Sequence, residues 1–489
     1  MALILVPVLF ILAFASSLQK VSADQPHFGQ ADYDEYNAGR YGNRPNQSYH
    51  TVDFKSPAFL INSWRRDAVS PESHIFMGLE VDGQAHSPFI FSAKDLSLVY
   101  ADPSWYGREL IGLQDYQGKK YMTIWSGEHK LGWGTGHVLL LDGKYQVFKN
   151  MTTTDDLDTG ANVHEFQLTH DGGALFSIYT DRNFIIKTTE GPVGGRLQGG
   201  AFQEIDLETG KARFTWVASD NIDLGESVNR DTVIASAKGE AGWDWVHQNS
   251  VEKTSDGNYL VSEPHLSAVM LINGTDGGRI WQLGGKRNDF RDLSGGRATG
   301  FSRQHHARFV DGSMRELTLF TNDASYAGGN SKIVGCEKWC SRALRIALDY
   351  DVMTARVVQE WYHLKSAQAW TQGGVQALPA GGAMIAWGSV PSFTEVAADG
   401  EIVMEVQLSP WFTNQVGQHD GVSMSRVYKS DFKAYPPWDP AVACVNGTLY
   451  VSWNGATEVD SWSVVSLPSS IFSHTACPAF PFRPARAYR

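Results

Sequence analysis

The chain has 489 residues, of which 42% are hydrophobic and 12% aromatic, and this length is ample for a large buried core. Its formal net charge is −12, and no basic run stands out along it. Because phosphate binding needs a basic surface, this charge argues against nucleic acid as a partner. The 48 glycines and 16 tryptophans indicate many tight turns and many aromatic surfaces.

The N-terminus reads as a secretory signal peptide over residues 1–23. Residues 1–15 are apolar and uncharged, and Val21-Ser22-Ala23 fits a small-residue cleavage site. A membrane anchor is the less favoured alternative, because the run is short and no other stretch reaches 18 apolar residues. We therefore expect a protein of the secretory pathway, secreted or vesicular, with no membrane span after processing.

The rest of the chain is predicted to be almost entirely strands and turns. Residues 24–70 are polar and irregular, which indicates an arm that wraps the main domain or is partly disordered. From residue 71 to 467 hairpin patterns follow one another, and no long stretch shows helical periodicity with clear caps. Residues 468–489 are Pro-rich and basic, as in a surface strap. The clearest hairpins are Leu139–Phe148, Phe202–Trp216, Val269–Trp281, Leu344–Trp361 and Phe393–Val406.

Repeats that supply two hairpins each are typical of β-propellers, in which four-stranded sheets stand around an axis. We predict an all-β fold, a six-bladed β-propeller closed by N- and C-terminal strands, with seven blades or two sandwiches as alternatives. Closing the ring in this way removes open sheet edges. Five blades are expected near residues 107–150, 160–220, 243–290, 302–365 and 370–410. A sixth would join residues 75–105 to strands at Cys444–Trp453 and Asp460–Leu467.

Four of these segments resemble one another at their start. Three open on His164, His247 and His305, and the fourth opens on Gln372, each just before a short strand, a Gly turn and a second apolar strand. If the repeats surround an axis, these side chains meet at one opening of the channel. Neutral imidazole can serve there as nucleophile, base or hydrogen-bond partner, and clustered histidines hold one another in the neutral form. The alternative is that each histidine only makes structural hydrogen bonds.

Several neighbours are candidate members of the same site. Asn249 lies two residues after His247, on the same face of an extended strand, and one of His305 and His306 should face the funnel. The flanking tryptophans could form an aromatic wall. The acidic run Asp155–Asp158 is read as a solvated loop rather than a calcium site, and we expect neither a metal site nor a cofactor. The further substrate-binding candidates are His306, Trp243, Trp245, Trp370, Gln372, Gln376 and Arg303.

The four cysteines and four sequons agree with secretion. Cys336 and Cys340 could close a small loop, and Cys444 and Cys477 could tie down the C-terminal segment. Four free thiols are the alternative, and a zinc site is less favoured because a second close pair of ligands is missing. We expect a glycoprotein with N-glycans at the Asn-X-Ser/Thr sites Asn46, Asn150, Asn273 and Asn446.

Three blocks in order resemble the arylsulfotransferase family, in its fungal branch, over residues 75–465. They are Asp244–Ser262, Phe301–Phe309 and Val375–Glu395. The resemblance implies a six-bladed propeller that moves a sulfuryl group between phenols without a nucleotide donor. By motif, His305 matches the attacking nucleophile. His247 and Asn249 match the pair that holds the sulfuryl oxygens and works on the phenol proton, and His164 matches a further funnel histidine.

One residue departs from the family pattern. Where an arginine aimed at the sulfate is expected, this chain has Glu263-Pro264-His265. A cationic donor at such a place is typically worth about 10²–10³ in rate. His265 or Arg303 would have to replace it, and Glu263 would oppose an anionic donor.

We therefore favour a different activity as the prediction from the sequence. Fungal relatives of this kind resemble secondary-metabolite cyclisation catalysts, and we expect a cofactor-free hetero-Diels–Alder cycloaddition of a tropolone- or phenol-derived quinone methide with a terpene. Orientation in an apolar aromatic funnel can supply about 7–11 kcal/mol in the best intramolecular cases. Aryl sulfotransfer through a sulfohistidine is the first alternative, and a non-catalytic binding propeller is the second. The expected partners are small aromatic or terpenoid substrates.

Overall fold

The computed structural model describes residues 27–463, apart from residues 82–83, 131, 158, 189–190, 230–241, 324–333, 337–339, 415–420 and 447. The predicted signal peptide and the C-terminal strap lie outside the described residues. Within the described part the α-helices are short, with α1 at Tyr33–Asn37 and α2 at Ala218–Asn221, and strands dominate. No helix among these residues has the length and apolar character needed to cross a bilayer.

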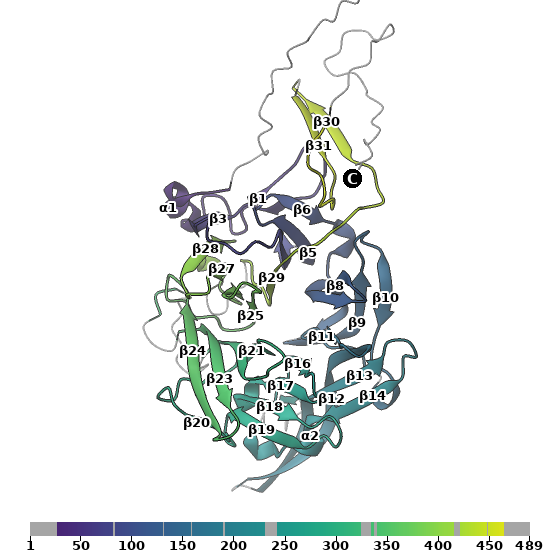
Figure 1. Ribbon diagram of the computed structural model, residues 1–489, viewed down its shortest axis with the longest axis vertical. Coiled ribbons are helices and arrows are strands. Elements are labelled where there is room, and N and C mark those ends of the chain that lie inside the picture. Colours follow the sequence, from purple (N-terminus) through teal and green to yellow (C-terminus); the bar gives the residue numbers. More distant parts are fainter. Residues whose placement is uncertain are drawn as a thin grey trace, which may run out of the picture.

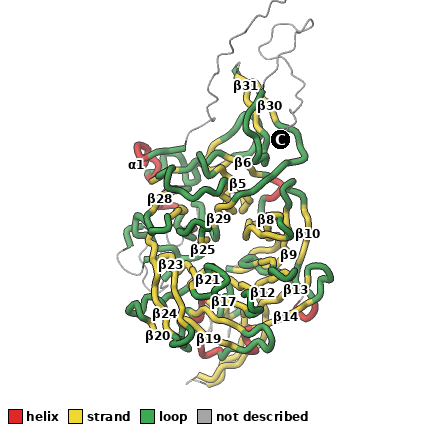
Figure 2. Tube along the Cα trace, viewed as in Figure 1, coloured by secondary structure: helices red, strands yellow, loops and turns green. Residues whose placement is uncertain are grey.

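Six antiparallel sheets stand around one axis, as predicted (Figures 1 and 2). In each sheet one strand touches the equivalent strand of a neighbouring sheet and forms the inner wall; these strands are β29, β7, β11, β16, β21 and β25. In order from the inside, the first three blades are β29 (Val427–Ser430), β4 (His74–Val81), β5 (Gln84–Ser92), β6 (Leu98–Ala101); β7 (Glu109–Tyr116), β8 (Lys119–Lys130), β9 (Trp133–Leu141), β10 (Val147–Met151); and β11 (Phe166–Leu168), β12 (Gly173–Thr188), β13 (Gly191–Asp206), β14 (Ala212–Val217).

The other three blades have the same build, and two of them carry an extra edge strand. They are β16 (Ser250–Lys253), β17 (Tyr259–Glu263), β18 (Ala268–Ile272), β19 (Arg279–Gly284); β21 (Gln304–Phe309), β22 (Glu316–Thr321), β23 (Arg342–Asp349), β24 (Thr354–Tyr362), β20 (Arg291–Asp292); and β25 (Gly374–Ala377), β26 (Ala383–Ala386), β27 (Ser392–Val396), β28 (Ile402–Gln407), β3 (Leu60–Trp64). The short β15 (Trp243–Asp244) pairs in parallel with β13.

The strand that closes the ring is not the predicted one. β29 pairs with β4, Val427 opposite Met77 and Ser430 opposite His74, and becomes the inner strand of the first blade. The expected segment forms a separate hairpin of β30 (Ala441–Val445) and β31 (Thr448–Ser452), which stands outside the ring in Figure 1. The reason is burial: β29 has two fully buried side chains, whereas β30 and β31 have none. Residues 460–463 form no strand.

The N-terminal arm is packed onto the ring. β1 (Asn46–Gln47) pairs with β2 (Ser56–Pro57), and β3 extends the outer edge of the sixth blade. Phe59, fully buried, packs edge-on against Phe91 and Phe393, which belong to the first and sixth blades. The arm thus fills the seam at which the ring closes.

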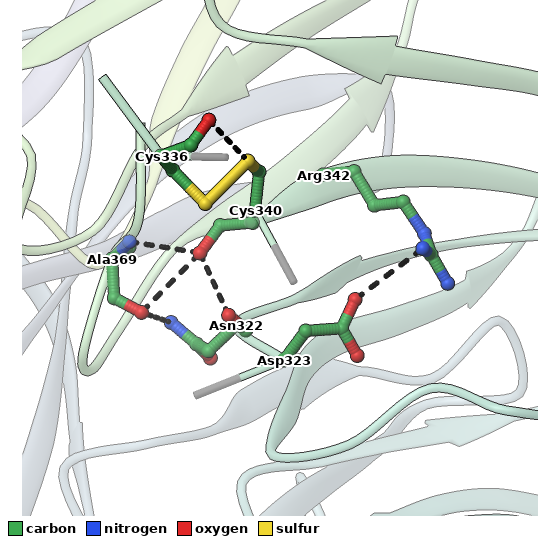
Figure 3. Close-up of a disulfide and its surroundings, with 7 residues drawn as sticks. Asn322, Asp323, Cys336, Cys340, Arg342 and Ala369 are labelled. Carbon is green, nitrogen blue, oxygen red and sulfur yellow. Dashed lines mark hydrogen bonds and ion pairs between the residues drawn. A yellow bond between two sulfur atoms is a disulfide. The ribbon is translucent and has the colours of Figure 1, made fainter. Parts of the chain in front are cut away.

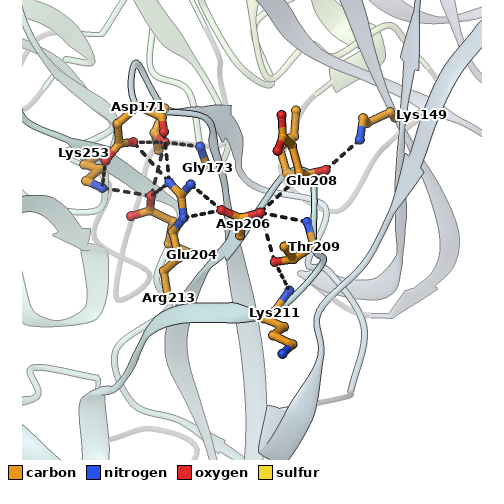
Figure 4. A network of polar contacts seen from close by, with 12 residues as sticks. Lys149, Asp171, Gly173, Glu204, Asp206, Glu208, Thr209, Lys211, Arg213 and Lys253 are labelled. Atoms are coloured by element: carbon orange, nitrogen blue, oxygen red, sulfur yellow. Dashed lines mark hydrogen bonds and ion pairs between the residues drawn. The ribbon is translucent and has the colours of Figure 1, made fainter.

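Polar networks tie neighbouring blades together at the rim (Figure 4). Nζ of Lys253 lies 2.7 Å from a carboxylate oxygen of Asp171 and 2.9 Å from one of Glu204. Arg213 extends the network to Asp206 at 2.5 Å. Because Lys253 belongs to β16 and the acids to the preceding blade, this network joins two blades through charges.

The predicted Cys336–Cys340 disulfide is present (Figure 3). Cys444 is also disulfide-bonded, and Cys477, its expected partner, lies outside the described residues. At the predicted glycan sites Asn46, Asn150 and Asn446 are exposed and Asn273 is half-buried. Glycosylation at these positions stays a prediction.

Candidate active site at the leading ends of the inner strands

Three histidines from three blades gather near the axis. His164 and His247 precede β11 and β16, and their ring centroids are 5.1 Å apart. His305 lies near the start of β21, close enough to His247 for that residue to lower the pKa of His305. The structure therefore brings together the three residues whose segments resemble one another in sequence.

His305 is held in one tautomer. Its Nδ1 lies 3.0 Å from the carbonyl oxygen of Arg303 and 2.8 Å from Oδ1 of Asn322. The amide nitrogen of Asn322 donates to the carbonyls of Ala369 and Gln372, so its oxygen must face the imidazole (Figure 3 shows the contact with Ala369). Two acceptors at Nδ1 fix the proton there and leave a lone pair on Nε2.

His247 and His164 are held in the same way. Nδ1 of His247 lies 2.5 Å from Oδ2 of Asp244, and Nδ1 of His164 lies 2.6 Å from Oδ1 of Asn162. The amide nitrogen of Asn162 donates to the carbonyl of Gly134, which fixes the orientation of that amide. Each imidazole therefore has a basic Nε2, and the site contains three of them.

His305 and His164 are held in the neutral form. Burial, together with the nearby His247, lowers the pKa of His305 to about 3. Burial, with His247 and His305, also holds the pKa of His164 well below its usual range. A buried imidazole without a proton on Nε2 is a competent nucleophile or base near pH 7.

Several members of the site were missed or misread from the sequence. His265, interpreted as structural, lies with its ring centroid 4.8 Å from that of His247, and its Nδ1 donates to the carbonyl of Asp244 at 2.7 Å. Nε2 of His265 accepts from Arg303 at 3.4 Å. The hydroxyl of Tyr179, on β12, lies 2.8 Å from Nδ1 of His247. The spacing Asp244-X-X-His247 was the one local signal that could have identified a partner.

The backbone shows that the repeats align differently from the sequence interpretation. His247, Arg303 and Gln372 have φ values of +55°, +51° and +62°, a left-handed conformation that costs a non-glycine residue about 1–3 kcal/mol. Each stands just ahead of its inner strand. When the three segments are aligned at these left-handed residues, Arg303 corresponds to His247, and His305 corresponds to Asn249. Such strain persists where the surrounding fold fixes it, often at functional sites.

Three predicted site residues serve packing instead. Asn249 is 2% exposed and its amide donates to the carbonyl of Gln304 in the next blade at 2.7 Å. Trp243 and Trp245 are fully buried among core side chains. Since neither indole reaches the channel, the predicted aromatic wall from these two residues is wrong. Trp370 is half-buried and packs against the core of the sixth blade.

A different aromatic pair flanks the histidines. Trp133, at the tip of the β8–β9 hairpin, stacks on Tyr179 with centroids 5.1 Å apart and planes 7° apart. A methyl group on the adjacent Gly132 would lie 3.5 Å from Cε1 of His247, so the turn passes close to the imidazole. The hairpin thus places an aromatic surface beside the site.

His306 and Gln376 line a cavity of about 290 Å³ together with Arg308 and Tyr428. Gln376 bonds both backbone groups of Lys429 and so joins β25 to β29. Nearby, Arg426 is buried and binds Glu165, which Arg308 also contacts. The cavity borders the histidine cluster, because Arg426 donates to the carbonyl of His164 at 2.7 Å and His305 lowers the pKa of His306.

Glu263, at the position where the family pattern has arginine, ends β17 and is fully buried. Neither carboxyl oxygen has a hydrogen-bond partner among the described residues. Burial raises the pKa of this carboxyl well above its usual range, and the nearby Asp244 raises it further. Burial thus favours the neutral form of this carboxyl beside the site.

Comparisons with solved structures find distant similarities. Among solved structures, a protein of unknown function from Bacteroides caccae is 13% identical, with 73% of this chain and 98% of that chain covered and a TM-score of 0.41. A protein from Lactobacillus plantarum is 8% identical (72% and 99% covered, TM-score 0.35), and AztD from Citrobacter koseri is 8% identical (74% and 100% covered, TM-score 0.34). These low scores say nothing about activity.

No curated protein matches this chain. The arylsulfotransferase (ASST) family matches residues 112–409, more than half of the sequence, from β7 of the second blade to the end of the sixth. The matched region contains His164, His247 and His305. The chain therefore belongs to the arylsulfotransferase family.

Proposed function

We propose that this protein is a nucleotide-independent aryl sulfotransferase in which His305 carries the sulfuryl group. The observation that supports this most is the tautomer of His305: two acceptors hold the proton on Nδ1, and burial keeps the ring neutral, so Nε2 offers a lone pair. An activated nucleophile oriented by a third group is the usual arrangement for covalent catalysis.

The transfer divides into two displacements at sulfur. First, Nε2 of His305 bonds to the sulfur of an aryl sulfate while the S–O bond breaks, and its electron pair leaves with the phenolate. Then a second phenol gives its proton to Nε2 of His247, its oxygen bonds to sulfur, and the N–S electron pair returns to His305. Asp244 supports His247 by stabilising the imidazolium that forms.

The charge on the sulfuryl group needs a cationic partner. Arg303 stands between His265, which its guanidinium contacts, and His305, whose Nδ1 its carbonyl holds. It is therefore our candidate for the role that the family gives to the missing arginine. The stacked Trp133 and Tyr179 would receive the aryl ring of the substrate.

A His305→Ala variant tests this function. With an aryl sulfate donor and a phenol acceptor, we expect the rate of phenol release to fall at least about 10³-fold, as when other nucleophiles are removed. In the parent protein, quenching during turnover should reveal a sulfuryl mass gain on the peptide that contains His305. The exposed His170→Ala variant should match the parent protein. A His305→Ala variant with normal transfer would refute the role of His305.

The second candidate is a cofactor-free cyclase of the fungal secondary-metabolite branch, joining a quinone methide to a terpene. Glu263 favours it, because a neutral buried acid in place of the expected arginine suits an uncharged substrate. Its aromatic surface would come from Trp133 and Tyr179, since Trp243 and Trp245 are buried in the core. Turnover of a tropolone-derived quinone methide without any sulfohistidine would favour this activity over sulfotransfer.

A further inference from the structure

We propose that Asp244, His247, His265 and Tyr179 form a binding site for a divalent metal ion of the zinc type. One ligand atom from each of Asp244, His247 and His265 lies within 4.8 Å of the others. The hydroxyl of Tyr179 approaches the same group, 2.8 Å from Nδ1 of His247 and 3.4 Å from Oδ1 of Asp244. Four N and O donors from three separate chain segments therefore converge on one point.

The spacing of these donors is close to that of a tetrahedral site. Bonds of about 2.0–2.1 Å to zinc place tetrahedral ligands about 3.3 Å from one another. Here Oδ2 of Asp244 lies 2.5 Å from Nδ1 of His247 and 4.0 Å from Nδ1 of His265. The distances fall on both sides of the tetrahedral value, and a bound ion would replace the Nδ1 protons of His247 and of His265, which now donates to the carbonyl of Asp244 at 2.7 Å.

The surroundings favour a cation. The side chains of Asp244, His247 and His265 are 21%, 16% and 13% exposed, so the group is shielded and still open to solvent on one side. Glu263, fully buried next in space to Asp244, has no hydrogen-bond partner among the described residues for either carboxyl oxygen. A cation bound beside Asp244 would favour ionisation of this carboxyl, which burial otherwise keeps protonated. Imidazole with carboxylate suits zinc better than magnesium or calcium, which prefer oxygen ligands.

Metal binding would also act on catalysis, and this consequence rests on the proposed function. A metal on Nδ1 of His247 replaces the proton there, which moves to Nε2. The imidazole then has no lone pair for the proton of the acceptor phenol. Bound zinc should therefore inhibit aryl transfer by blocking its second displacement.

The experiment measures binding first, without substrate. The full-length protein is freed of metal with a chelator and titrated with Zn²⁺ by calorimetry and with Co²⁺ by visible absorption. We expect one ion per chain, a tetrahedral Co²⁺ spectrum, and a melting temperature that rises with Zn²⁺ but not with Mg²⁺. His265→Gln should weaken Zn²⁺ binding more than about 100-fold, beyond the 10–100-fold that outer-shell losses cause.

Controls separate this site from others. The exposed His170→Gln variant should bind Zn²⁺ like the parent protein. If folded His265→Gln and Asp244→Asn proteins, verified by circular dichroism, bind Zn²⁺ as tightly as the parent, or if the parent binds none, the proposal is overturned. Zinc binding in a protein that transfers no sulfuryl group would reject the proposed function and retain the metal site.

Discussion

Which imidazole nitrogen holds the proton decides what each histidine of this site can do. His164, His247 and His305 all donate from Nδ1 to an oxygen, and each of those oxygens belongs to a side chain or carbonyl fixed by a further contact. Such outer partners determine the orientation and basicity of the ring in the same way that they do for metal ligands. The chemistry at Nε2 therefore depends on Asn162, Asp244 and Asn322 as much as on the histidines.

Replacing Asn322 should separate orientation from substrate binding. In Asn322→Ala, Nδ1 of His305 keeps only the carbonyl of Arg303, so the ring can turn or change tautomer. We expect kcat to fall about tenfold or more, a barrier increase of about 1.4 kcal/mol, with little change in KM. Asn322→Gln, which keeps both an acceptor and an amide donor, should lose less. Equal losses in both variants would mean that Asn322 only supports the fold.

Among the elements, the β8–β9 hairpin is the one that determines what stands over the site. Its strands approach closely at two opposed glycines, Gly127 and Gly136. A Cβ on Gly127 would lie 2.2 Å from the carbonyl oxygen of Thr135. The hairpin can therefore hold Gly132 and Trp133 beside His247 only while no side chain separates its strands.

A Gly127→Ala variant tests this role. The added methyl group must push the strands apart, and we expect a loss of about 1–3 kcal/mol in the free energy of unfolding, measured by urea denaturation. KM for the aryl donor should rise, because Trp133 moves away from Tyr179. Gly312→Ala is the control, since a Cβ there meets nothing within 4 Å. Unchanged stability and KM in Gly127→Ala would show that the hairpin is not held in this way.

For the molecule as a whole, the decisive interaction is the one that closes the ring. Lys429 of β29 is 1% exposed, and its Nζ lies 2.7 Å from Oε2 of Glu395 in the sixth blade and 2.8 Å from the carbonyl oxygen of Ser70 in the arm. One buried cation thus joins the first blade, the last blade and the N-terminal arm. Removing it leaves a buried carboxylate without its partner.

Lys429→Met should therefore destabilise the protein by about 3–5 kcal/mol in urea unfolding. A second substitution, Glu395→Met, should recover much of that loss because it removes the unpaired charge. Arg65→Met is the matched surface control. The side chains of Arg65 and its ion-pair partner Glu401 are 49% and 60% exposed, so we expect a loss of only about 0–1 kcal/mol in the free energy of unfolding. A Lys429→Met protein as stable as the control would exclude the pair as the closing contact.

The pH dependence of stability follows from titratable groups buried in several blades. Burial lowers the pKa of His305 and of His363 to about 3, and that of His164 and His306 well below 6.5. The unfolded chain takes up these protons below about pH 6.5 and the folded chain does not, so stability falls as the pH falls.

Two buried acids oppose this trend over part of the range. Burial raises the pKa of Glu252 and Glu405 to about 7, so the folded chain holds more of their protons between pH 7 and about 4.5. Their contribution to stability rises as the pH falls through that window. Below about pH 4.5 the unfolded chain is protonated as well, so their contribution no longer changes with pH. Because four histidines oppose two acids, we expect urea midpoints that already fall from pH 7 to 5 and fall more steeply below about 4.5. A midpoint that is constant down to pH 3 would contradict the neutral histidines.

The sequence by itself determined the all-β class, the six blades and the three histidines at their leading ends. Strand alternation and turn chemistry are local properties, and a repeated pattern reports the symmetry that places equivalent residues around an axis. The Cys336–Cys340 loop was equally local. These features need no knowledge of which segments lie side by side.

Only the tertiary structure decided what surrounds those histidines. Val427–Ser430, and not residues 444–453, closes the ring. Its buried Lys429 forms an ion pair with Glu395, which lies more than 30 residues earlier in the chain. Tyr179 joins the site from the middle of β12, and His265 and Asn322 join it from just beyond the ends of β17 and β22, the second strands of their blades. Trp243 and Trp245 do not line the site, because both side chains are buried in the apolar core between two blades. The protonated nitrogen of each imidazole is set by partners that only folding brings within hydrogen-bond distance.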